Sequence, residues 1–501
     1  MVATGTDRIL RIDTGGGDGP RVWTDLPGKY VGLGGRAMAS QLVCSEVPPD
    51  CHPLDAENKL VLAPGFMSGT TALSGNLFIG SKTPLSDYLA VATSRGGAAE
   101  ALARLGYAAV VIEGKPRSDA LHTIHISPDR VEVLPADHER GTTCRELASR
   151  LPGPEVSVIG IGPAGERRML AAVATVCDAG GAPSRRFGRG GDGAVMGAKG
   201  IKAIVVDARN SDPRKPAKPK LFRAAWKRFL EHMGPAADGA SLPDFPECPN
   251  CGGKPCPDLT AENTPARNAG HTSSRILRPA VDVAWAFGQV TGLDAPGIER
   301  LEIMCEEYGL DPVETGMTLR VAVQAGLLGR GDTARALELV REAGEGTVMG
   351  QMLGSGAAVA AACLGVAHIA QDDHARLEKE LLDQLTGGNG RAELTCRLLV
   401  VSMALEMVGY CPYMALSVLK RPGSFQAVID AINAVYGLSM THDDMMRLSE
   451  GTLRNEREFN ARVAKAREAD QYRLHPPANL LGPFGALFDN TGPARECSYE
   501  L

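Results

Sequence analysis

Three cysteines lie close together in the segment Cys248-Pro-Asn-Cys251-Gly-Gly-Lys-Pro-Cys256. Thiolates at such short spacing on a Gly/Pro-rich loop can converge on one soft metal centre, whereas a disulfide between near neighbours would be strained and would close little loop entropy. The spacing suits an iron-sulfur cluster and also a structural zinc site. A zinc site would prefer a second close CxxC or HxxxH pair, and none follows, so the pattern favours the cluster.

A fourth ligand for this centre must come from a distant part of the chain. The cysteines downstream that could supply it are Cys305, Cys363, Cys396, Cys411 and Cys497. Cys411 is the one with a turn-forming residue on either side, Gly409 and Pro412, and such a turn can aim a thiolate at a metal.

A glycine-rich loop forms a second candidate site. Residues 185–200 contain Gly188, Gly190 and Gly193 among three arginines and lead directly into an apolar run at 201–206. Closely spaced glycines let backbone N–H groups approach a ligand, and with the arginines they can bind phosphate or another anion. The literal G-x-G-x-x-G match is weak for a dinucleotide site, because no strand precedes it and no acidic residue follows at the expected spacing. A mobile surface loop is the alternative.

Composition limits the class of protein. The chain has 501 residues, 44% hydrophobic and 22% charged, which provides core for two or three domains. Its net charge of -6 argues against a nucleic-acid binder, which would show a basic face. No run approaches the roughly 20 apolar residues that span a bilayer, and the first 20 residues do not form a signal peptide. We therefore expect a cytoplasmic protein with no membrane partner, whose 12 cysteines are thiols or metal ligands.

The apolar pattern changes near residue 210. Before it, short apolar runs bounded by Gly and Pro predict strands at 59–63, 108–113, 156–160 and 201–206. After it, helical spacing of apolar residues predicts helices at 298–308, 315–328, 334–343 and 392–408. We therefore predict an α+β protein: a β-rich domain at 1–210, a solvated Pro/Lys linker at 211–222, and helical domains at 223–335 and 336–501, the last with a wrapped tail.

Several stretches together resemble the aldehyde ferredoxin oxidoreductase family. They appear in the family's order over about the first 210 residues: Tyr30-Val-Gly-Leu-Gly-Gly-Arg-Ala, Glu46-Val-Pro-Pro, Pro53-Leu-Asp-Ala-Glu-Asn-Lys-Leu, Ser81-Lys-Thr-Pro-Leu, Val111-Ile-Glu-Gly-Lys, and above all Gly188-Arg-Gly-Gly-Asp-Gly-Ala-Val-Met-Gly-Ala-Lys-Gly-Ile-Lys-Ala-Ile-Val-Val. Downstream, Gly309-Leu-Asp311 and Glu406-Met-Val-Gly-Tyr-Cys411 are similar to the family's pterin-contacting turn and Asp-Ser-Leu-Gly-Leu-Cys segment.

The resemblance implies a set of cofactors and the residues that hold them. Members bind tungsten, or molybdenum, through two pyranopterins on N-terminal sheets, beside one four-iron four-sulfur cluster that passes electrons to ferredoxin. By similarity, Asp311 and Glu406 accept hydrogen bonds from pterin amines; without the family match, a helix N-cap and a surface carboxylate are the default interpretations. The cluster ligands are Cys248, Cys251, Cys256 and Cys411, and the pterin phosphates lie against Arg186, Gly188, Arg189, Gly190, Gly191 and Gly193.

The chain also departs from the family pattern near the pterins and the metal. Asn76 stands where an arginine is common, and Ser94 followed by Arg95 stands where an asparagine is usual. Asp282 takes the place of a longer glutamate near the metal. The loss of one cation at position 76 leaves open whether Arg95 replaces it.

Two further family elements are missing. Cys305 and Tyr308 occupy the positions of a subunit-bridging Glu-x-x-His, so that iron bridge is not expected, although a homodimer is not excluded. The block that supplies an active-site histidine has no counterpart between residues 364 and 391. His368 or His374 could take over proton transfer there, and the competing interpretation is a surface histidine on a charged helix.

Two functions are consistent with these matches to the family pattern and departures from it. The first is a shortened oxidoreductase that oxidises an aldehyde or related small carbonyl substrate at a tungsten or molybdenum pyranopterin and passes electrons through the cluster to ferredoxin or a similar carrier. The second is a family member that has lost the pterin metal and serves as an electron-transfer or scaffold subunit. A NAD-dependent dehydrogenase is disfavoured by the weak glycine fingerprint.

Overall fold

The fold comes from a computed structural model of the chain. It describes residues 7–17, 19–71, 74–151, 153, 155–178, 185–233, 283, 285–289, 291–366, 391–421 and 423–469. Six of the predicted site residues lie outside these ranges: Cys248, Cys251, Cys256, Asp282, His368 and His374.

The first sheet has six strands in the order β2-β1-β6-β3-β4-β5. Its strands are β1 Arg8–Asp13, β2 Arg21–Asp25, β3 Leu60–Pro64, β4 Asn76–Lys82, β5 Leu89–Arg95 and β6 Tyr107–Glu113. All neighbours are antiparallel except β1 and β6. Every residue of β3 and β4 is buried, as expected for strands that are covered on both faces of the sheet. Helix α1 (Gly35–Glu46) packs on one face of this sheet.

The second sheet also has six strands, in the order β11-β10-β9-β12-β7-β8. They are β7 His122–Ile126, β8 Val131–Pro135, β9 Val156–Ile161, β10 Ala174–Asp178, β11 Arg185–Arg186 and β12 Ile201–Asp207. Short helices accompany the two sheets: α2 Gly97–Arg104, α3 Cys144–Ser149, α4 Pro163–Glu166 and α5 Asp192–Ala198. One apolar core contains buried side chains of both sheets, such as Leu62 and Ile204, so the sheets pack face to face.

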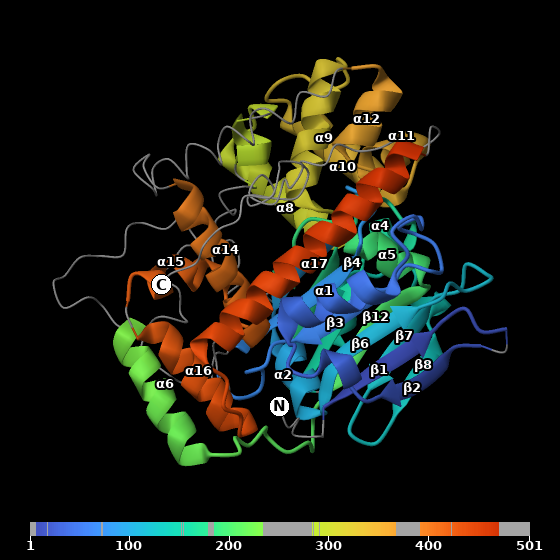
Figure 1. Cartoon of the computed structure of the whole chain (residues 1–501). Coiled ribbons are helices and arrows are strands. Elements are labelled where there is room, and N and C mark those ends of the chain that lie inside the picture. Colours follow the sequence, from blue (N-terminus) through green and yellow to red (C-terminus); the bar gives the residue numbers. More distant parts are fainter. Residues whose placement is uncertain are drawn as a thin grey trace.

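The rest of the described chain is helical and forms two groups (Figure 1). The first group shares one core and comprises α8 Ala295–Tyr308, α9 Pro312–Gln324, α10 Thr333–Glu345, α11 Val348–Gly354 and α12 Ala357–Leu364, with a π-helical turn at Trp285–Gln289. The second group comprises α6 Pro219–Met233, α14 Arg391–Val408, α15 Ala415–Leu419, α16 Ser424–Tyr436 and α17 His442–Ala469. The long helix α17 runs back across α1 and packs Phe459 and Val463 against Met38 and Leu42 (Figure 1).

The predicted fold class is confirmed. The four predicted strands correspond to β3, β6, β9 and β12, and the four predicted helices to α8, α9, α10 and α14. Strands end at Asp207 among the described residues, and helices follow. Helix α6 begins at Pro219, inside the stretch predicted as a linker.

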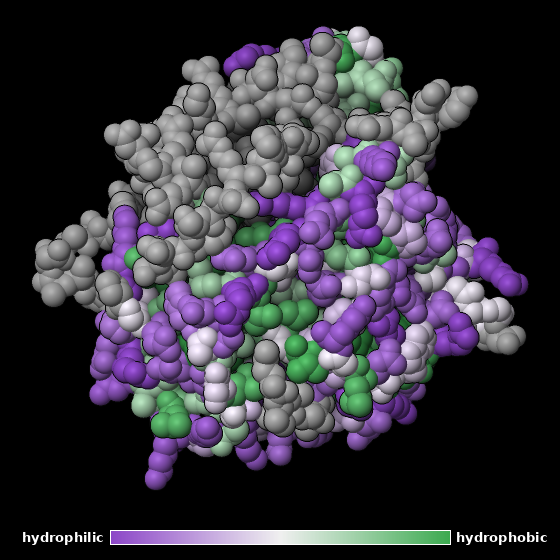
Figure 2. All heavy atoms as spheres, viewed as in Figure 1, coloured by the Kyte–Doolittle hydropathy of each residue, from purple (hydrophilic) through white to green (hydrophobic). Residues whose placement is uncertain are grey.

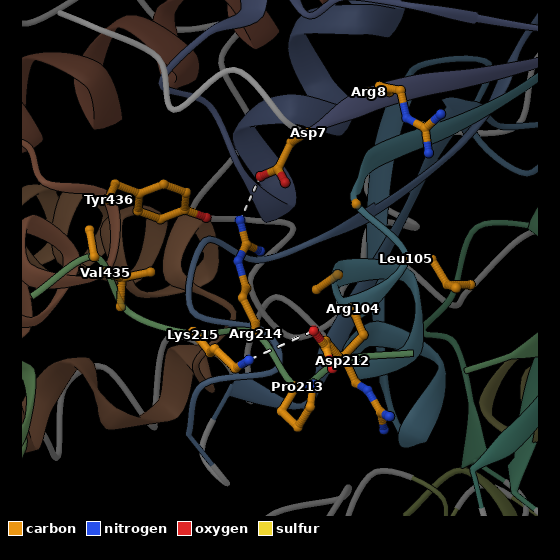
Figure 3. A pocket seen from close by; sticks show the side chains of 13 residues that line it. Asp7, Arg8, Arg104, Leu105, Asp212, Pro213, Arg214, Lys215, Val435 and Tyr436 are labelled. Atoms are coloured by element: carbon orange, nitrogen blue, oxygen red, sulfur yellow. Dashed lines mark hydrogen bonds and ion pairs between the residues drawn. The ribbon is translucent and has the colours of Figure 1, made fainter. Parts of the chain in front are cut away.

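The basic run after residue 211 is not wholly solvated, contrary to the sequence-based expectation. Arg214 donates to Asp7 at 2.5 Å, and its guanidinium lies 5.0 Å from the centre of the Tyr436 ring. A cleft of about 480 Å³ lies here between the start of β1, the end of α2 and the end of α16 (Figure 3). Two of its basic side chains, Arg214 and Arg104, pair with Asp7 and Glu155. None of the predicted site residues that the structure describes lines this cleft.

The helices of the described residues do not meet the requirements of a membrane span. On the face seen in Figure 2, hydrophilic side chains predominate and hydrophobic ones occur in small groups. Among the described residues, no helix combines the length and apolar character needed to cross a bilayer.

Glycines allow the end of α14 to lie directly against the start of α1. Gly35 has a φ of 51°, in the left-handed region, and a Cβ built there would collide with the carbonyl oxygen of Glu406. Nearby, the backbone N–H groups of Phe66 and Met67 donate to Met407 and Val408 at 3.0 Å. These contacts join residues more than 340 positions apart in the sequence, and they bring the end of α14 to the first sheet.

We therefore expect Gly35→Ala to destabilise the fold by about 3 kcal/mol, because the methyl group would strain the backbone and push α14 away. Gly451→Ala is the matched control, since a Cβ at this position in α17 meets nothing within 4 Å. It should leave stability unchanged or raise it by up to about 1 kcal/mol through helix propensity. Denaturant unfolding of both variants measures the difference, and equal stabilities would contradict the role given to Gly35.

Candidate functional site

Several of the predicted site residues that are described lie along the β4–β5 hairpin, with Asn76 and Arg95 at its open end and Gly190 near Thr83 at its turn end. Asn76 opens β4 and pairs directly with Arg95, the last residue of β5. On one side, the Asn76 N–H donates to the carbonyl oxygen of Gly409 at 3.4 Å. On the other side, the Ser94 hydroxyl donates to the carbonyl oxygen of Arg185 at 2.8 Å. The hairpin end therefore lies between the Glu406–Cys411 segment and the arginines that precede the glycine loop.

The glycine loop runs over the small side chains of β5. A Cβ at Gly188 would meet only Ala92, at 3.6 Å, so space is open beside this residue. Gly191 and Gly193 serve packing instead. Gly191 has a φ of 77°, and a Cβ at Gly193 would lie 2.6 Å from the backbone of Val173. The loop is thus pressed against the 170–173 segment on one side and leaves room beside Gly188.

Ion pairs connect the glycine loop to the first helical group. Arg189 donates to Glu314 on α9 at 2.6 Å, and the Glu314 side chain is fully buried. The second carboxylate oxygen of Glu314 accepts the Ala357 N–H at the start of α12, at 2.9 Å. Arg186 lies 3.5 Å from Glu302 on α8. A buried carboxylate needs such partners, so Glu314 holds three segments together.

Asp311 is the N-cap of α9 and is only 2% exposed. Its Oδ1 accepts the Glu314 N–H at 2.8 Å, and its own N–H donates to Ala171 at 2.9 Å. Burial raises the pKa of Asp311, although Arg189 opposes the shift. The N-cap interpretation is correct as local structure. Among the described residues Oδ2 accepts no hydrogen bond, so the cap leaves one oxygen for a ligand.

Glu406 is buried rather than on a helix surface, because it belongs to an ionic cluster. Arg36 on α1 donates to Glu406 at 2.9 Å and to both oxygens of Glu456 on α17, at 3.1 and 2.9 Å. The Ser40 hydroxyl also donates to Glu456. Burial raises the pKa of Glu406 above its ordinary value, with Arg36 opposing. One guanidinium on α1 therefore holds two carboxylates, one from α14 and one from α17.

Cys411 follows α14 closely and is 9% exposed. It is the N-cap of the 3₁₀ turn Pro412–Met414 and lies in the same apolar core as Met407 and Tyr410. Gly409, two residues earlier, has a φ of 94° and turns the chain out of α14. The predicted turn at Cys411 is therefore present. Within the described ranges no three His, Cys, Asp or Glu side chains gather to hold a metal, and the other three predicted ligands lie outside them.

Asp192 was missed as a functional candidate, although an acid inside a glycine run is a visible signal. It opens α5 directly after Gly191 and is 3% exposed. Its Oδ2 accepts the Ala174 N–H at 3.4 Å, whereas Oδ1 is buried without a hydrogen bond among the described residues. Burial raises the pKa of Asp192 to about 8, with the charge of Asp311 adding to the shift. A proton on this carboxyl removes a charge that would otherwise repel an anion at the loop.

Sequence reasoning also missed the partners of the predicted carboxylates. Arg36 lies within a stretch that resembles the family, but nothing local connects it to Glu406 or to Glu456, 420 residues away. Glu314 looks like an ordinary first-turn glutamate in the sequence. Their roles appear only when α1, α9, α14 and α17 are placed beside one another.

The described residues fit an anionic, hydrogen-bonding cofactor. The open space beside Gly188 and the arginines on β11 and in the glycine loop suit phosphate groups. The carboxylate oxygens Oδ2 of Asp311 and Oε1 of Glu406 accept no hydrogen bond within the described part of the chain. They suit donors such as ring amines.

Family models match most of the chain. The N-terminal domain of aldehyde ferredoxin oxidoreductase matches residues 9–208, and domains 2 and 3 of the same family match residues 241–376 and 363–481. The chain belongs to the aldehyde ferredoxin oxidoreductase family. The resemblance drawn from its motifs is thereby confirmed, and it extends through the helical half. The curated relatives in this family are oxidoreductases.

Curated relatives cover part of this chain. The tungsten-containing aldehyde ferredoxin oxidoreductase of Pyrococcus furiosus is 28% identical over 333 residues, which are 58% of this chain and 54% of that protein. The enzyme of the same description from Pyrococcus horikoshii is 37% identical over 179 residues, 35% of this chain and 28% of that protein. An aliphatic sulfonate oxidoreductase WOR-like subunit of P. furiosus is 28% identical over 237 residues, 42% of this chain and 36% of that protein. The alignment with the first of these spans about half of that relative's length.

A solved structure has the same fold. It is the active-site complex BamBC of benzoyl coenzyme A reductase with 1,5-dienoyl-CoA, matched with a TM-score of 0.73 at 18% identity over 96% of this chain and 92% of that one. At this identity the match speaks for the fold alone. The family and the fold therefore agree, and the substrate is a separate question.

The buried Asp192 predicts a pH-dependent stability. Its pKa is 3.8 as an ordinary carboxyl and about 8 in the folded chain, so between these values the folded state binds a proton that the unfolded state has lost. The free energy of unfolding then falls as pH rises, by up to about 1.4 kcal/mol per unit. Asp192→Asn removes this loss, so its Tm should rise relative to the unmodified chain between about pH 5 and about pH 8.

The control for this measurement is Asp129→Asn, in the exposed turn after β7. It should leave the pH profile of the Tm unchanged. Parallel Tm curves for Asp192→Asn and the unmodified chain would show that Asp192 is not a buried, protonated acid.

Proposed function

We propose that this protein is an oxidoreductase that oxidises an aldehyde or a related small carbonyl substrate at a tungsten or molybdenum bis-pyranopterin. Electrons leave through a four-iron four-sulfur cluster to ferredoxin or a similar carrier. The observation that carries the proposal is that the Glu406–Cys411 segment and the arginines before the glycine loop contact the same end of the β4–β5 hairpin, along which the loop then runs. Two segments far apart in the sequence, one with Glu406 and Cys411 and one leading into the glycine loop, therefore flank the same hairpin.

In this proposal the N-terminal sheets hold the pterin phosphates. Backbone N–H groups beside Gly188 and Gly190 bind them, together with Arg186 and Arg189. Arg95 supplies the cation that position 76 lacks, because it is the direct cross-strand neighbour of Asn76. The open space at Gly188 supports this assignment.

The helical half supplies the hydrogen-bond acceptors for the pterin rings. Asp311 Oδ2 and Glu406 Oε1 take these roles, and both side chains are positioned by their other oxygen. Fixing one oxygen in place lowers the entropy lost when the second binds a ligand. When bound, the pterin metal supplies two-electron redox chemistry. Asp282 near the metal and a proton carried by His368 or His374 remain predictions, as does the ligand set Cys248, Cys251, Cys256 and Cys411.

The second candidate, a subunit that has lost the pterin metal, is favoured by a different observation. Arg189 and Glu406 already have protein partners, Glu314 and Arg36. Ion pairs of this kind stabilise the fold without a cofactor. A scaffold or electron-transfer subunit would need these ion pairs for its stability but no pterin. Metal content separates the two candidates.

The decisive measurement is the elemental composition of protein purified without oxygen. An enzyme of the proposed kind should contain about one tungsten or molybdenum and about four irons per chain, with organic pterin released on denaturation. About four irons with neither heavier metal nor pterin would instead indicate the electron-transfer subunit. Absence of all three would contradict both candidates.

The cluster assignment makes a separate prediction. Cys411→Ala should lose most of the iron and the brown colour, because a thiolate ligand is removed. Cys363→Ala is the matched control, since this cysteine is exposed on α12, and it should keep both. Unchanged iron in Cys411→Ala at equal protein stability would remove Cys411 from the ligand set.

A further inference from the structure

Two cysteines outside the proposed site lie side by side beneath the surface of the second sheet. Cys144 opens α3 and is 5% exposed, and Cys177 lies in β10 and is fully buried. Both belong to one small apolar cluster, whose other buried members are Leu147, Ala148, Val158 and Ala203. The cluster fills the space between α3 and the sheet.

The strand register places the two thiols on the same face of the sheet. Cys177 pairs with Val158, and two residues away Thr175 pairs with Gly160. The Cys144 thiol donates to the Thr175 carbonyl oxygen at 3.4 Å. A Cβ at Gly160 would lie only 3.3 Å from the Cys144 sulfur, so the missing side chain at Gly160 makes room for this thiol next to β10.

The thiols also interact with each other. The neighbouring Cys144 thiol, together with burial, raises the pKa of Cys177. Cys305 is as buried as Cys177, but the groups that act on its thiol are Thr315 and the charged side chains Asp311, Arg186 and Glu302. Cys144 and Cys177 therefore form a dithiol, whereas Cys305 provides an internal comparison.

We propose that Cys144 and Cys177 form a reversible intrachain disulfide when the protein meets a small-molecule disulfide such as oxidised glutathione. In this exchange the two S–H bonds break and one S–S bond forms. Two electrons and two protons pass to the oxidant, whose own S–S bond breaks to give two thiols. The less buried Cys144 reacts first with the oxidant, and Cys177 then displaces the bound half. A dithiol reductant reverses the reaction.

The bond would cross-link a junction between the two halves of the chain. Arg145, next to Cys144, donates to Glu306 on α8 at 2.6 Å. Asp178, next to Cys177, accepts from the Gly97 N–H at the start of α2 at 2.9 Å and from Ser157 at 2.7 Å. Linking α3 to β10 therefore restrains the contact between the second sheet and α8. It also restricts the unfolded chain, which stabilises the fold. The inference does not depend on the proposed cofactors.

The test uses the full chain, purified without oxygen and incubated with oxidised glutathione. Free thiols are then alkylated in denaturant, and each cysteine peptide is quantified by mass spectrometry. We expect the Cys144 and Cys177 peptides to be recovered joined, two hydrogens lighter than the sum of the free peptides, while Cys305 is alkylated in full. Treatment with dithiothreitol should restore alkylation of both, and the Tm should be higher before this reduction than after it.

Single substitutions give the control. In Cys144→Ser the Cys177 thiol should be alkylated in full after the same incubation, and the Tm should no longer respond to the oxidant. Cys305→Ser should behave like the unmodified chain. The proposal is wrong if Cys144 and Cys177 of the unmodified, folded chain are still alkylated after oxidation. It is equally wrong if either one is recovered joined to another cysteine or to glutathione. These outcomes are read from the unmodified chain and need no variant to fold.

Discussion

The pairing of Arg36, whose side chain is only 15% exposed, is the constraint on which the arrangement of the site depends. A guanidinium inside a protein must be neutralised and hydrogen-bonded, or it destabilises the fold by several kcal/mol. Here Glu406 and Glu456 meet that requirement from α14 and α17, while Arg36 itself lies at the start of α1. The three helices can satisfy the charge only when the end of α14 lies against Gly35. The same contact places Cys411 and the Gly409 carbonyl beside the β4–β5 hairpin.

A second buried pair repeats this logic on the other side of the hairpin. Arg189 and Glu314 bind the glycine loop to α9, and Glu314 also receives the first N–H of α12. Each half of the candidate cofactor site is thus held by a charge pair between the sheets and the helices. In both places the carboxylate proposed to face a pterin, Glu406 or Asp311, keeps a second oxygen outside the hydrogen bonds described. These ion pairs hold the segments that carry the two acceptor carboxylates in fixed positions. They would also stabilise the fold if no pterin were bound.

Family membership and fold limit the chemistry without fixing the substrate. The family models match most of the chain, while the curated relatives align over about half of their length or less. Two of the matching relatives differ in the substrate that they are named for, an aldehyde in one case and an aliphatic sulfonate in the other. A common scaffold therefore serves more than one reaction. In the proposed enzyme the residues beside the metal would set the choice of substrate, and Asp282 is the candidate that the sequence offers among them.

The amino-acid sequence alone predicted the fold class, because strand and helix periodicity and turn residues are local properties. Its motifs carried the resemblance to the family, and that resemblance marked Asp311, Glu406, Cys411 and the glycine loop as candidate site residues. The sequence did not reveal Arg36, Glu456 and Glu314 as partners, nor the adjacency of Cys144 and Cys177. It also left Asp192 looking like one more polar residue in a loop. Each of these depends on side chains separated by 30 to more than 400 residues. The packing of helices on sheets decides which charged side chains are buried next to one another. Their burial determines which of them pair and in which direction their pKa values shift.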